Sequence, residues 1–333
     1  MTRVLALCSA ADVTGSVKQF DLALPALRER FEVVRHALPA DVRRVVKEVR
    51  PDLLHTLGAE AFRAVRKVAL AKLRPGLWLL PRWLAAGAAA VEPMCGFVPG
   101  LTATFSQCEH DREWAARLMP APMQFSGPVA VSGLLARRAE SEPARGASRP
   151  LTILACGGFD AVANLRFVVW AFDALRYAHP LLRLVVLGDG PERPDLERFA
   201  RTLGLESERV HFTGFQPDIA PHLRSAMQAW CTHTRGGTKF LLEAVASGVP
   251  VIAARTPDTE RVIRDGVNGR LVPVGRPVEM ARVAHGLLGS PDEAGSLVVA
   301  SETAAARYPV ADLAEALARV YHTLTSSASP RPE

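Results

Sequence analysis

Two hydrophobic patterns alternate along the first part of the chain. Short strand-like runs cover residues 4–8, 31–37 and 52–56. Between them, apolar side chains recur at helical spacing over residues 17–30, 41–49 and 60–73. Strands that alternate with helices in this way predict parallel βαβ units and a doubly wound sheet.

A second series of the same kind begins at residue 151. Its strand-like runs cover residues 151–156, 182–188, 210–214, 227–233 and 249–255. Its helical patterns cover residues 165–176, 195–203, 219–226 and 238–247, with further helices near Asp258, Val278 and Ala311. The strand-like runs are nearly continuous in apolar residues, which indicates burial on both faces of a parallel sheet. We therefore predict an α/β protein of two Rossmann-like doubly wound domains facing a cleft, with ligands at the carboxyl ends of the strands.

Residues 137–150, RRAESEPARGASRP, separate the two series. They are rich in charge, Pro and Ser and lack apolar periodicity, which is typical of a linker. This segment predicts an N-terminal domain over 1–136 and a C-terminal domain over 151–326, followed by a disordered tail over 327–333. After Pro81 the pattern decays, and a further helix is expected at 108–118.

Composition supports a folded chain in a reducing compartment. With 333 residues, 49% hydrophobic and 22% charged, the chain can bury two cores and does not belong to the disordered class. Its five cysteines form no C-x-x-C pair, which indicates buried thiols rather than a disulfide framework. We see no secretory signal, and the apolar segment from Gly76 is interrupted by Pro81 and Arg82 and is too short to span a membrane. We expect a cytoplasmic protein, with attachment to a membrane surface left open.

The segment from Trp230 to Gly269 carries the clearest candidate chemistry. A buried strand is expected to end at His233, a flexible Arg-Gly-Gly turn follows, and Thr238 opens a helix. Glycines let a backbone approach a ligand closely, and the free N–H groups of a helix start attract phosphate and other anions. Glu243 lies five residues into this helix, where its carboxylate can accept hydrogen bonds from ligand hydroxyls.

Several sequence motifs occur in a family-specific order. They are VVLGDGPERPDLERFARTLGL from Val185, RVHFTGF from Arg209, LLEAVASGVPVIA from Leu241, TERVIRDGVNGRLV from Thr259 and YHTL from Tyr321. Together they resemble the nucleotide-sugar-binding region of GT-B-fold, family 4 retaining glycosyltransferases. The resemblance is strong from residue 151 onward. It is faint before that, where DVTGSVKQF from Asp12 resembles the family's first glycine loop and RPDLLHTLG from Arg50 its third strand.

The resemblance implies a hexosyltransferase-type enzyme that needs neither metal nor cofactor. A nucleotide-diphosphate sugar would be the co-substrate, and the first domain would bind the acceptor, in glycan, glycolipid or cell-envelope synthesis. The family's second glutamate falls on Glu243, which would hold the ribose, and the diphosphate would meet backbone N–H groups near Gly237 and Thr238. The donor-binding residues implied are Gly15, Gly158, Phe215, Arg235, Gly236, Gly237, Thr238 and Glu243, whereas no catalytic residue is assigned. No Asp-x-Asp pair of the metal-using kind occurs.

The chain departs from the family pattern at four polar positions. Arg235 stands at the first glutamate, Gly158 and Ala163 stand where an Arg and a Lys usually neutralise the diphosphate, and a histidine of the first domain has no counterpart. Either Arg235 or Arg166 supplies the missing positive charge. Alternatively, the protein is a catalytically inactive GT-B protein that binds a sugar nucleotide or a partner glycosyltransferase. A sugar-nucleotide epimerase of similar fold is a third alternative.

Three smaller expectations concern other residues. His55 is expected to be a hydrogen-bonded core histidine rather than part of an acceptor site, and the same caution applies to His233. The GDGP segment from Gly188 is expected to be a turn required by backbone geometry. The basic segment from Arg44 is expected to be the solvated face of a helix.

The net charge of +6 is unevenly distributed. Residues 1–150 hold an excess of seven basic residues, whereas residues 151–333 hold one more acidic than basic residue. The basicity therefore lies in the half that would bind the acceptor, which favours an acidic or membrane-associated acceptor. A solvated, arginine-rich surface is the alternative. No motif supports nucleic-acid binding.

Overall fold

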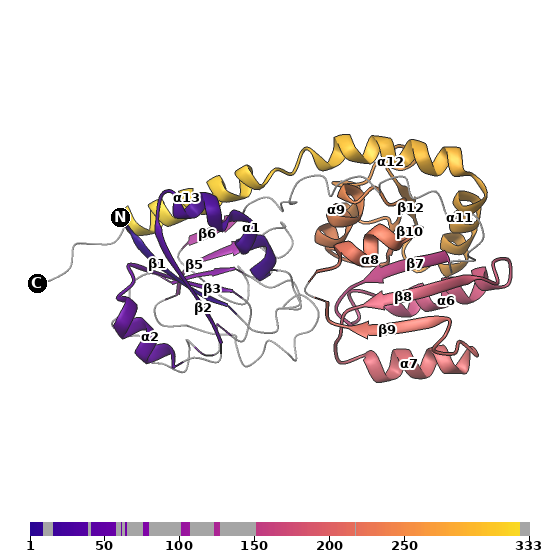
Figure 1. Cartoon of the computed structure of the whole chain (residues 1–333), viewed down its shortest axis with the longest axis horizontal. Helices are drawn as coiled ribbons and strands as arrows, with labels where there is room; N and C mark the ends of the chain where they lie inside the picture. Colours follow the sequence, from indigo (N-terminus) through magenta and orange to yellow (C-terminus); the bar gives the residue numbers. More distant parts are fainter. Residues whose placement is uncertain are drawn as a thin grey trace, which may run out of the picture. The chain divides into compact units, whose positions relative to one another are not determined.

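The structure is a computed structural model of the chain. It describes residues 1–8, 16–38, 41–57, 61, 64, 76–79, 101–106, 123–126, 151–216 and 218–326. The chain divides into two compact units (Figure 1). Unit 1 combines Met1–Ala130 with Val310–Glu333, and unit 2 is Val131–Pro309.

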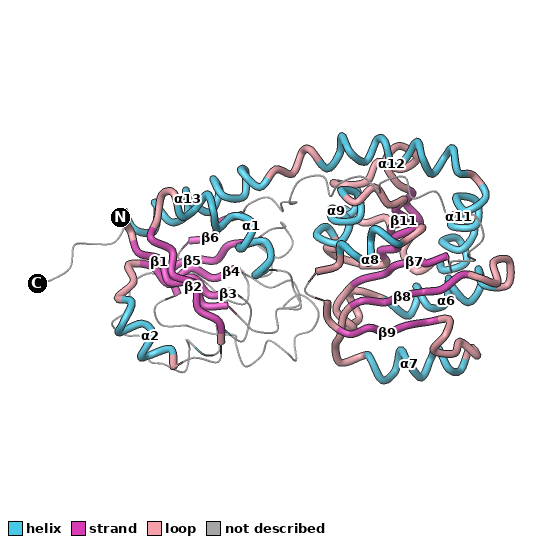
Figure 2. Tube along the Cα trace, viewed as in Figure 1, coloured by secondary structure: helices cyan, strands magenta, loops and turns pink. Residues whose placement is uncertain are grey.

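Unit 1 is built on a parallel sheet with strand order β2-β1-β3-β4-β5-β6 (Figure 2). Its strands are β1 Arg3–Cys8, β2 Glu32–Ala37, β3 Leu53–Leu57, β4 Gly76–Leu79, β5 Leu101–Ser106 and β6 Met123–Ser126. The first three strands match the predicted runs closely. The last three were not among the predicted runs.

Helices α1 (Ser16–Arg28) and α2 (Val42–Val49) cover opposite faces of this sheet. The Asp41 side chain caps α2 by accepting a hydrogen bond from the Arg44 N–H, as an N-cap residue should. The buried side of α2 consists of valines, which pack against Leu5 and Leu7 of β1. Arg44 is exposed and forms an ion pair with Glu48, so the predicted solvated face is confirmed.

The final helix of the described chain, α13 (Val310–Ser326), packs in unit 1 on the same face as α1. Leu313, Leu317 and Tyr321 form its buried stripe, together with Leu324. We predicted the helix, but we placed it in the second domain by extending that domain to residue 326. Helical spacing shows that a stripe must be buried without showing which core receives it.

Three predicted segments lie outside the described residues: the linker over 137–150, the helix at 108–118 and the tail over 327–333. Of the helix predicted over 60–73, the structure describes only Ala61 and Ala64, and both are helical.

Unit 2 contains a second parallel sheet, with strand order β12-β11-β10-β7-β8-β9. Its strands are β7 Leu151–Cys156, β8 Leu182–Leu187, β9 Val210–Gly214, β10 Gln228–Cys231, β11 Val251–Ala254 and β12 Arg270–Val272. Its helices are α6 Leu165–Arg176, α7 Arg193–Thr202, α8 Ala220–Ser225, α9 Thr238–Ala246, α10 Pro257–Glu260, α11 Pro277–Gly289 and α12 Pro291–Ala305. Every strand and helix predicted for this half is present, whereas β12 and α12 were missed.

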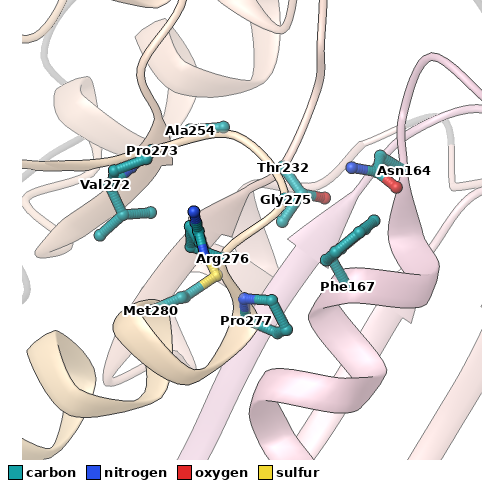
Figure 3. Close-up of a pocket in the computed structure, with 10 residues that line it drawn as sticks. All are labelled: Asn164, Phe167, Thr232, Ala254, Val272, Pro273, Gly275, Arg276, Pro277 and Met280. Carbon is teal, nitrogen blue, oxygen red and sulfur yellow. The ribbon is translucent and has the colours of Figure 1, made fainter.

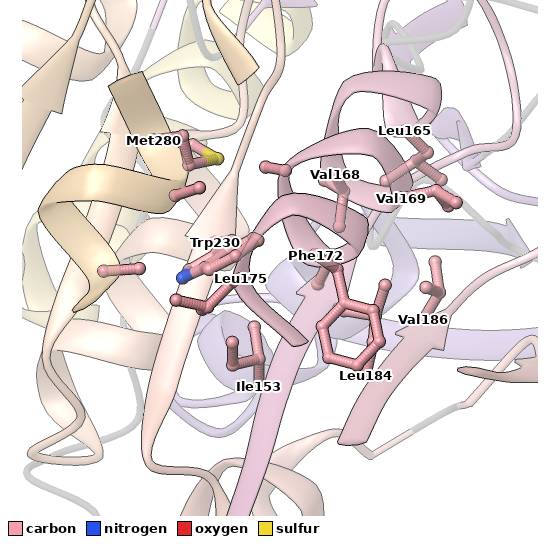
Figure 4. Close-up of a cluster of buried hydrophobic side chains, with 14 of the residues drawn as sticks. Ile153, Leu165, Val168, Val169, Phe172, Leu175, Leu184, Val186, Trp230 and Met280 are labelled. Carbon is pink, nitrogen blue, oxygen red and sulfur yellow. The ribbon is translucent and has the colours of Figure 1, made fainter. Parts of the chain in front are cut away.

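The main core of unit 2 lies between its sheet and helices α6, α7 and α11. Figure 4 shows the part of it that lies between the sheet, α6 and α11. Trp230 and Phe172 are among its fully buried side chains. The Trp230 indole N–H donates to the Gln228 side-chain oxygen (3.0 Å), and the Gln228 amide donates to the Ala284 carbonyl of α11 (3.0 Å). These buried polar groups are therefore paired, and they fix α11 to the centre of the sheet.

The predicted α/β class is confirmed by these two parallel sheets with helices on their faces. In unit 2, the chain leaves β7 toward β8 and β9, and it later returns on the other side of β7 as β10. The carboxyl ends of β7 and β10 therefore mark the topological switch point, where open α/β sheets bind ligands.

Candidate functional site

Two chain segments meet at this switch point and are hydrogen-bonded to each other. Residues 157–164 follow β7, and residues 232–237 follow β10. The Thr234 N–H donates to the Val162 carbonyl (2.9 Å), and the Thr232 hydroxyl donates to the Ala163 carbonyl (2.8 Å). The two segments consequently form one surface, which brings Gly158 and the predicted 235–238 segment to the same edge of the sheet.

Gly236 and Gly237 adopt a backbone conformation that favours glycine. Their φ angles are 66° and 83°. A Cβ atom on Gly237 would lie 2.7 Å from the Cys231 sulfur, closer than real Cβ contacts come. The prediction that glycines form the turn before α9 is confirmed, and glycine at Gly237 is required by both its φ angle and its space.

The first turn of α9 presents backbone N–H groups at the switch point. Gly237 is the N-cap residue, and the Leu241 N–H donates to its carbonyl (2.9 Å). The N–H groups of the preceding residues, Thr238 to Phe240, come before the first such bond of the helix. Together with the helix dipole, such N–H groups favour a negatively charged ligand.

Asp258 anchors the turn before α9 from outside. This carboxylate is 7% exposed and accepts a hydrogen bond from the Gly236 N–H (2.5 Å). It lies in the short helix α10, which begins at Thr256 with a capping box formed with Thr259. Sequence reasoning assigned no role to Asp258. The Thr-Pro-Asp-Thr capping signature was the available signal, but it does not reveal a partner 22 residues away.

Charged side chains of both signs lie on this segment. Arg235, Lys239 and Glu243 are all intermediate in exposure. Lys239 and Glu243 are four residues apart in α9, so they share one face of the helix. The site thus combines a carboxylate, suited to hydroxyl groups, with two cations, suited to phosphate. We did not predict Lys239, although its place in the first turn was visible in the sequence.

The segment after β7 lacks the cationic side chains expected there. The Asp160 carboxylate accepts hydrogen bonds from the N–H groups of Val162 (2.9 Å) and Ala163 (2.8 Å). Ala163 is 1% exposed and belongs to the core. A Cβ on Gly158 would already lie 3.0 Å from an Asp160 carboxylate oxygen. Gly158 therefore contributes backbone, and positive charge must come from other residues.

Gly188 confirms the predicted turn after β8. Its φ angle is 122°, and a Cβ atom there would lie 1.9 Å from the Gly157 carbonyl oxygen. The Phe159 N–H donates to the Asp189 carbonyl (3.0 Å), and the Glu192 N–H donates to the Phe159 carbonyl (2.9 Å). These two hydrogen bonds join the turn after β8 to the turn after β7. Burial raises the pKa of Glu192, with Asp160 and Asp195 adding to the rise.

Phe215 extends the site toward β9. It follows Gly214, whose carbonyl accepts a hydrogen bond from the Gly188 N–H (2.9 Å). Phe215 is 40% exposed and is therefore open to solvent. Gly15, the remaining donor-binding prediction, lies outside the described residues.

Arg166 points away from the anion site. Its guanidinium lies 4.0 Å above the ring of Phe199 in α7, a cation–π contact. This contact removes the support for Arg166 as a substitute diphosphate ligand. The cations nearest the turn in sequence are Arg235, which precedes it, and Lys239, which lies in the first turn of α9.

The two histidines considered from the sequence are both buried. His55 is fully buried, and its Nδ1 lies 2.6 Å from the Tyr321 hydroxyl of α13, so the prediction of a core histidine is confirmed. Burial lowers the pKa of His55 to about 3. His233 is 3% exposed, and its Nδ1 lies 3.2 Å from the Cys231 sulfur.

A small pocket lies beside the switch point, at the carboxyl ends of β10, β11 and β12 (Figure 3). Thr232 and Ala254 line its floor, and Asn164 and Arg276 line it at the starts of α6 and α11. It shares Thr232 with the site described above but is not lined by Glu243, Arg235 or Lys239.

The described residues contain neither a metal-ligand cluster nor a membrane-spanning helix. Within those parts of the chain, no three His, Cys, Asp or Glu side chains gather as metal ligands would. None of the helices described is long and apolar enough to cross a bilayer.

Comparison with known sequences gives one family match. Residues 150–290 match the family model described as Glycosyl transferases group 1. A phosphatidyl-myo-inositol mannosyltransferase of Mycobacterium leprae is 33% identical over 153 residues, which are 44% of this chain and 40% of that protein. An alpha-D-kanosaminyltransferase of Streptomyces kanamyceticus is 28% identical over 193 residues, 57% of this chain and 50% of that protein. The chain thus spans about half the length of these relatives or less.

Comparison with solved structures covers almost the whole chain. Anabaena Alr3699/HepE, solved in complex with UDP-glucose, superimposes with a TM-score of 0.76 at 16% identity, covering 97% of this chain and 100% of that one. Sucrose-phosphate synthase of Thermosynechococcus elongatus superimposes with a TM-score of 0.71 at 15% identity, covering 98% and 100%. At these identities the likeness shows the fold, which is GT-B. The resemblance to group 1 glycosyl transferases is confirmed for residues 150–290, and the GT-B fold is confirmed for the chain.

Proposed function

We propose that this chain is a retaining glycosyltransferase that transfers a hexosyl group from a nucleotide-diphosphate sugar to an acceptor in glycan, glycolipid or cell-envelope synthesis. The observation that carries the proposal is the segment from Arg235 to Glu243. This segment has the motif of group 1 glycosyl transferases and lies within residues 150–290, which match that family. It is also at the switch point of the unit 2 sheet.

The donor would be held by complementary charges on α9 and the turn before it. The Glu243 carboxylate can accept hydrogen bonds from both ribose hydroxyls. The N–H groups at the start of α9 and the side chains of Arg235 and Lys239 would neutralise the diphosphate, which also stabilises it as the leaving group. We propose that this set of cations makes a metal ion and any other cofactor unnecessary.

UDP is the first nucleotide to test. HepE was solved with UDP-glucose, and the pneumococcal O-GlcNAc transferase GtfA, with a TM-score of 0.63, was solved with UDP and GlcNAc. In our proposal the half-exposed Phe215 ring lies near the base, because aromatic rings stack well on bases.

We propose that the acceptor is acidic or membrane-associated. The named substrate of several relatives is a phosphatidyl-inositol lipid, and another relative acts in lipopolysaccharide core biosynthesis. Residues 1–150 hold the chain's basic excess, and α2 exposes Arg43, Arg44 and Lys47 on its outer face. We propose a cytoplasmic enzyme that works at the inner face of the membrane, since its described cysteines form no disulfide.

A thermal-shift screen of nucleotides and nucleotide sugars tests the donor site. UDP-sugars or another nucleotide sugar should raise the melting temperature of the wild-type chain, and Glu243→Ala should abolish the rise. Glu302→Ala is the matched control, because Glu302 is also a helical carboxylate of intermediate exposure. If no nucleotide stabilises the wild-type chain, or if both variants behave alike, the proposed donor site is wrong.

A second candidate function is donor binding without transfer, either alone or beside a partner glycosyltransferase. One observation favours it: Ala163 is buried and Gly158 lacks a side chain, so two cationic positions of the family are absent. The two functions differ in turnover. Release of nucleotide from a stabilising donor, with the anomeric configuration of the product retained, supports the enzyme. Stabilisation without release, in the presence of lipid and oligosaccharide acceptors, supports the binding protein.

A further inference from the structure

Two cysteines end neighbouring strands at the switch point. Cys156 is the last residue of β7, and Cys231 is the last residue of β10. These strands are parallel and pair Trp230 with Ala155. Cys156 and Cys231 follow this last pair, one step further along each strand.

The two side chains point to the same face of the sheet. Ala155 and Trp230 both face the core under α6 and α11. Successive side chains of a strand alternate between faces, so Cys156 and Cys231 both point to the opposite face, where α9 lies. The sulfur of Cys231 lies directly below the turn that begins α9, since a Cβ on Gly237 would lie 2.7 Å from it.

The backbone spacing suits a disulfide. Neighbouring strands lie about 4.8 Å apart. This separation falls within the window of about 4.4 to 6.8 Å between Cα atoms in which disulfides form. Neither residue is in a disulfide in this structure.

The two thiols differ in exposure and surroundings. Cys156 is intermediate in exposure and therefore open to a small oxidant, whereas Cys231 is 1% exposed. The Cys231 sulfur lies 3.2 Å from His233 Nδ1. At this distance the imidazole nitrogen can accept the thiol proton when the Cys231 sulfur reacts.

We propose that Cys156 and Cys231 are a redox pair that closes to a disulfide under peroxide and reopens under thiols. Hydrogen peroxide oxidises the Cys156 thiol to a sulfenic acid and leaves one water. The Cys231 sulfur then attacks the Cys156 sulfur, its proton passes to His233 Nδ1 and on to solvent, and the sulfenic oxygen leaves as a second water. In total, two thiols and one peroxide give one disulfide and two waters.

The disulfide would tie together the two segments of the candidate site. Gly157 and Gly158 directly follow Cys156, and the turn at Gly236 and Gly237 covers Cys231. We expect oxidation to weaken nucleotide stabilisation, and this consequence alone rests on the proposed function.

Peptide mapping of the full chain tests the pair. The chain is treated with hydrogen peroxide, its remaining thiols are alkylated, and it is digested without reductant for mass spectrometry. A cross-linked peptide joining Cys156 to Cys231 should form and should disappear with dithiothreitol. It should be absent in Cys156→Ser and Cys231→Ser and present in the control Cys8→Ser, which alters the buried cysteine of β1.

The wild-type map decides the question even if a variant fails to fold. Alkylation of both peptides with no cross-link, or an equal yield of links to other cysteines, would overturn the pair. The same cross-link forming equally fast in the urea-unfolded chain would also overturn it, because native placement would then have no effect. A cross-link that leaves nucleotide stabilisation intact would overturn only the expected effect on the donor site.

Discussion

Tyr321→Phe should destabilise unit 1 although it removes only one oxygen atom. The Tyr321 hydroxyl lies 2.6 Å from His55 Nδ1, and both side chains are fully buried. Nε2 of His55 has no hydrogen-bond partner among the described residues. The substitution therefore leaves the His55 imidazole without a hydrogen-bond partner from α13. The aromatic ring of residue 321 is retained, and in the wild-type chain it packs against Phe31 at a centroid distance of 5.2 Å.

An unsatisfied buried polar group costs about 1 to 3 kcal/mol. We expect a loss of this size in the free energy of unfolding, measured by urea denaturation followed by circular dichroism. His55→Leu combined with Tyr321→Phe removes both polar groups. It should cost less than the sum of the two single substitutions, with a coupling of at least about 0.5 kcal/mol.

The same pair predicts how stability depends on pH. Burial lowers the pKa of His55 from 6.5 to about 3. Below pH 6.5 the unfolded chain therefore binds a proton that the folded chain does not, so the free energy of unfolding falls with falling pH. The loss approaches about 1.4 kcal/mol per pH unit and reaches about 2 kcal/mol between pH 6.5 and 5. His55→Leu should remove this slope. If Tyr321→Phe is silent, or if the slope survives in His55→Leu, the reasoning is refuted.

Three further predictions concern the candidate site and the basic surface. Gly188→Ala should destabilise unit 2 by more than about 3 kcal/mol, because its Cβ would lie 1.9 Å from the Gly157 carbonyl oxygen. Urea denaturation measures the free energy of unfolding, and a loss below about 1 kcal/mol would contradict the prediction. Lys239→Ala should reduce thermal stabilisation by a nucleoside diphosphate more than by the nucleoside, whereas an equal reduction by both would exclude a phosphate contact. The chain should float with vesicles of anionic lipid but not with neutral vesicles, and charge reversal at Arg43 and Lys47 should abolish flotation; binding that ignores lipid charge would show that the basic excess is only solvated surface.

The sequence was most informative where one pattern determines one outcome. The strands of unit 2 are buried on both faces, so their apolar runs end close to where the strands end, as at 151–156 and 210–214. The turn at Gly236 and Gly237 was likewise predictable, because glycine is the residue that most readily adopts a left-handed backbone conformation. In these cases a local signal and a local constraint coincide.

Contacts distant in sequence could not be predicted in this way. The hydrogen bond from Gly236 to Asp258 depends on how α10 packs. The packing of α13 in unit 1 depends on which of the two cores has an apolar face left to bury. Ala163 is buried, so this position offers the site neither a charge nor an accessible side chain. A sequence motif can show that a residue is missing without showing what now fills its place.

The position of α13 also sets an order of events during synthesis. Unit 1 is assembled from residues 1–130 and from a helix that leaves the ribosome after the whole of unit 2. Unit 2 is continuous along the chain and can fold as soon as its last helix has emerged, whereas one apolar face of the unit 1 sheet must wait with only α1 covering it. Chaperone binding during translation should therefore concentrate on the nascent unit 1, although it is the first to be synthesised.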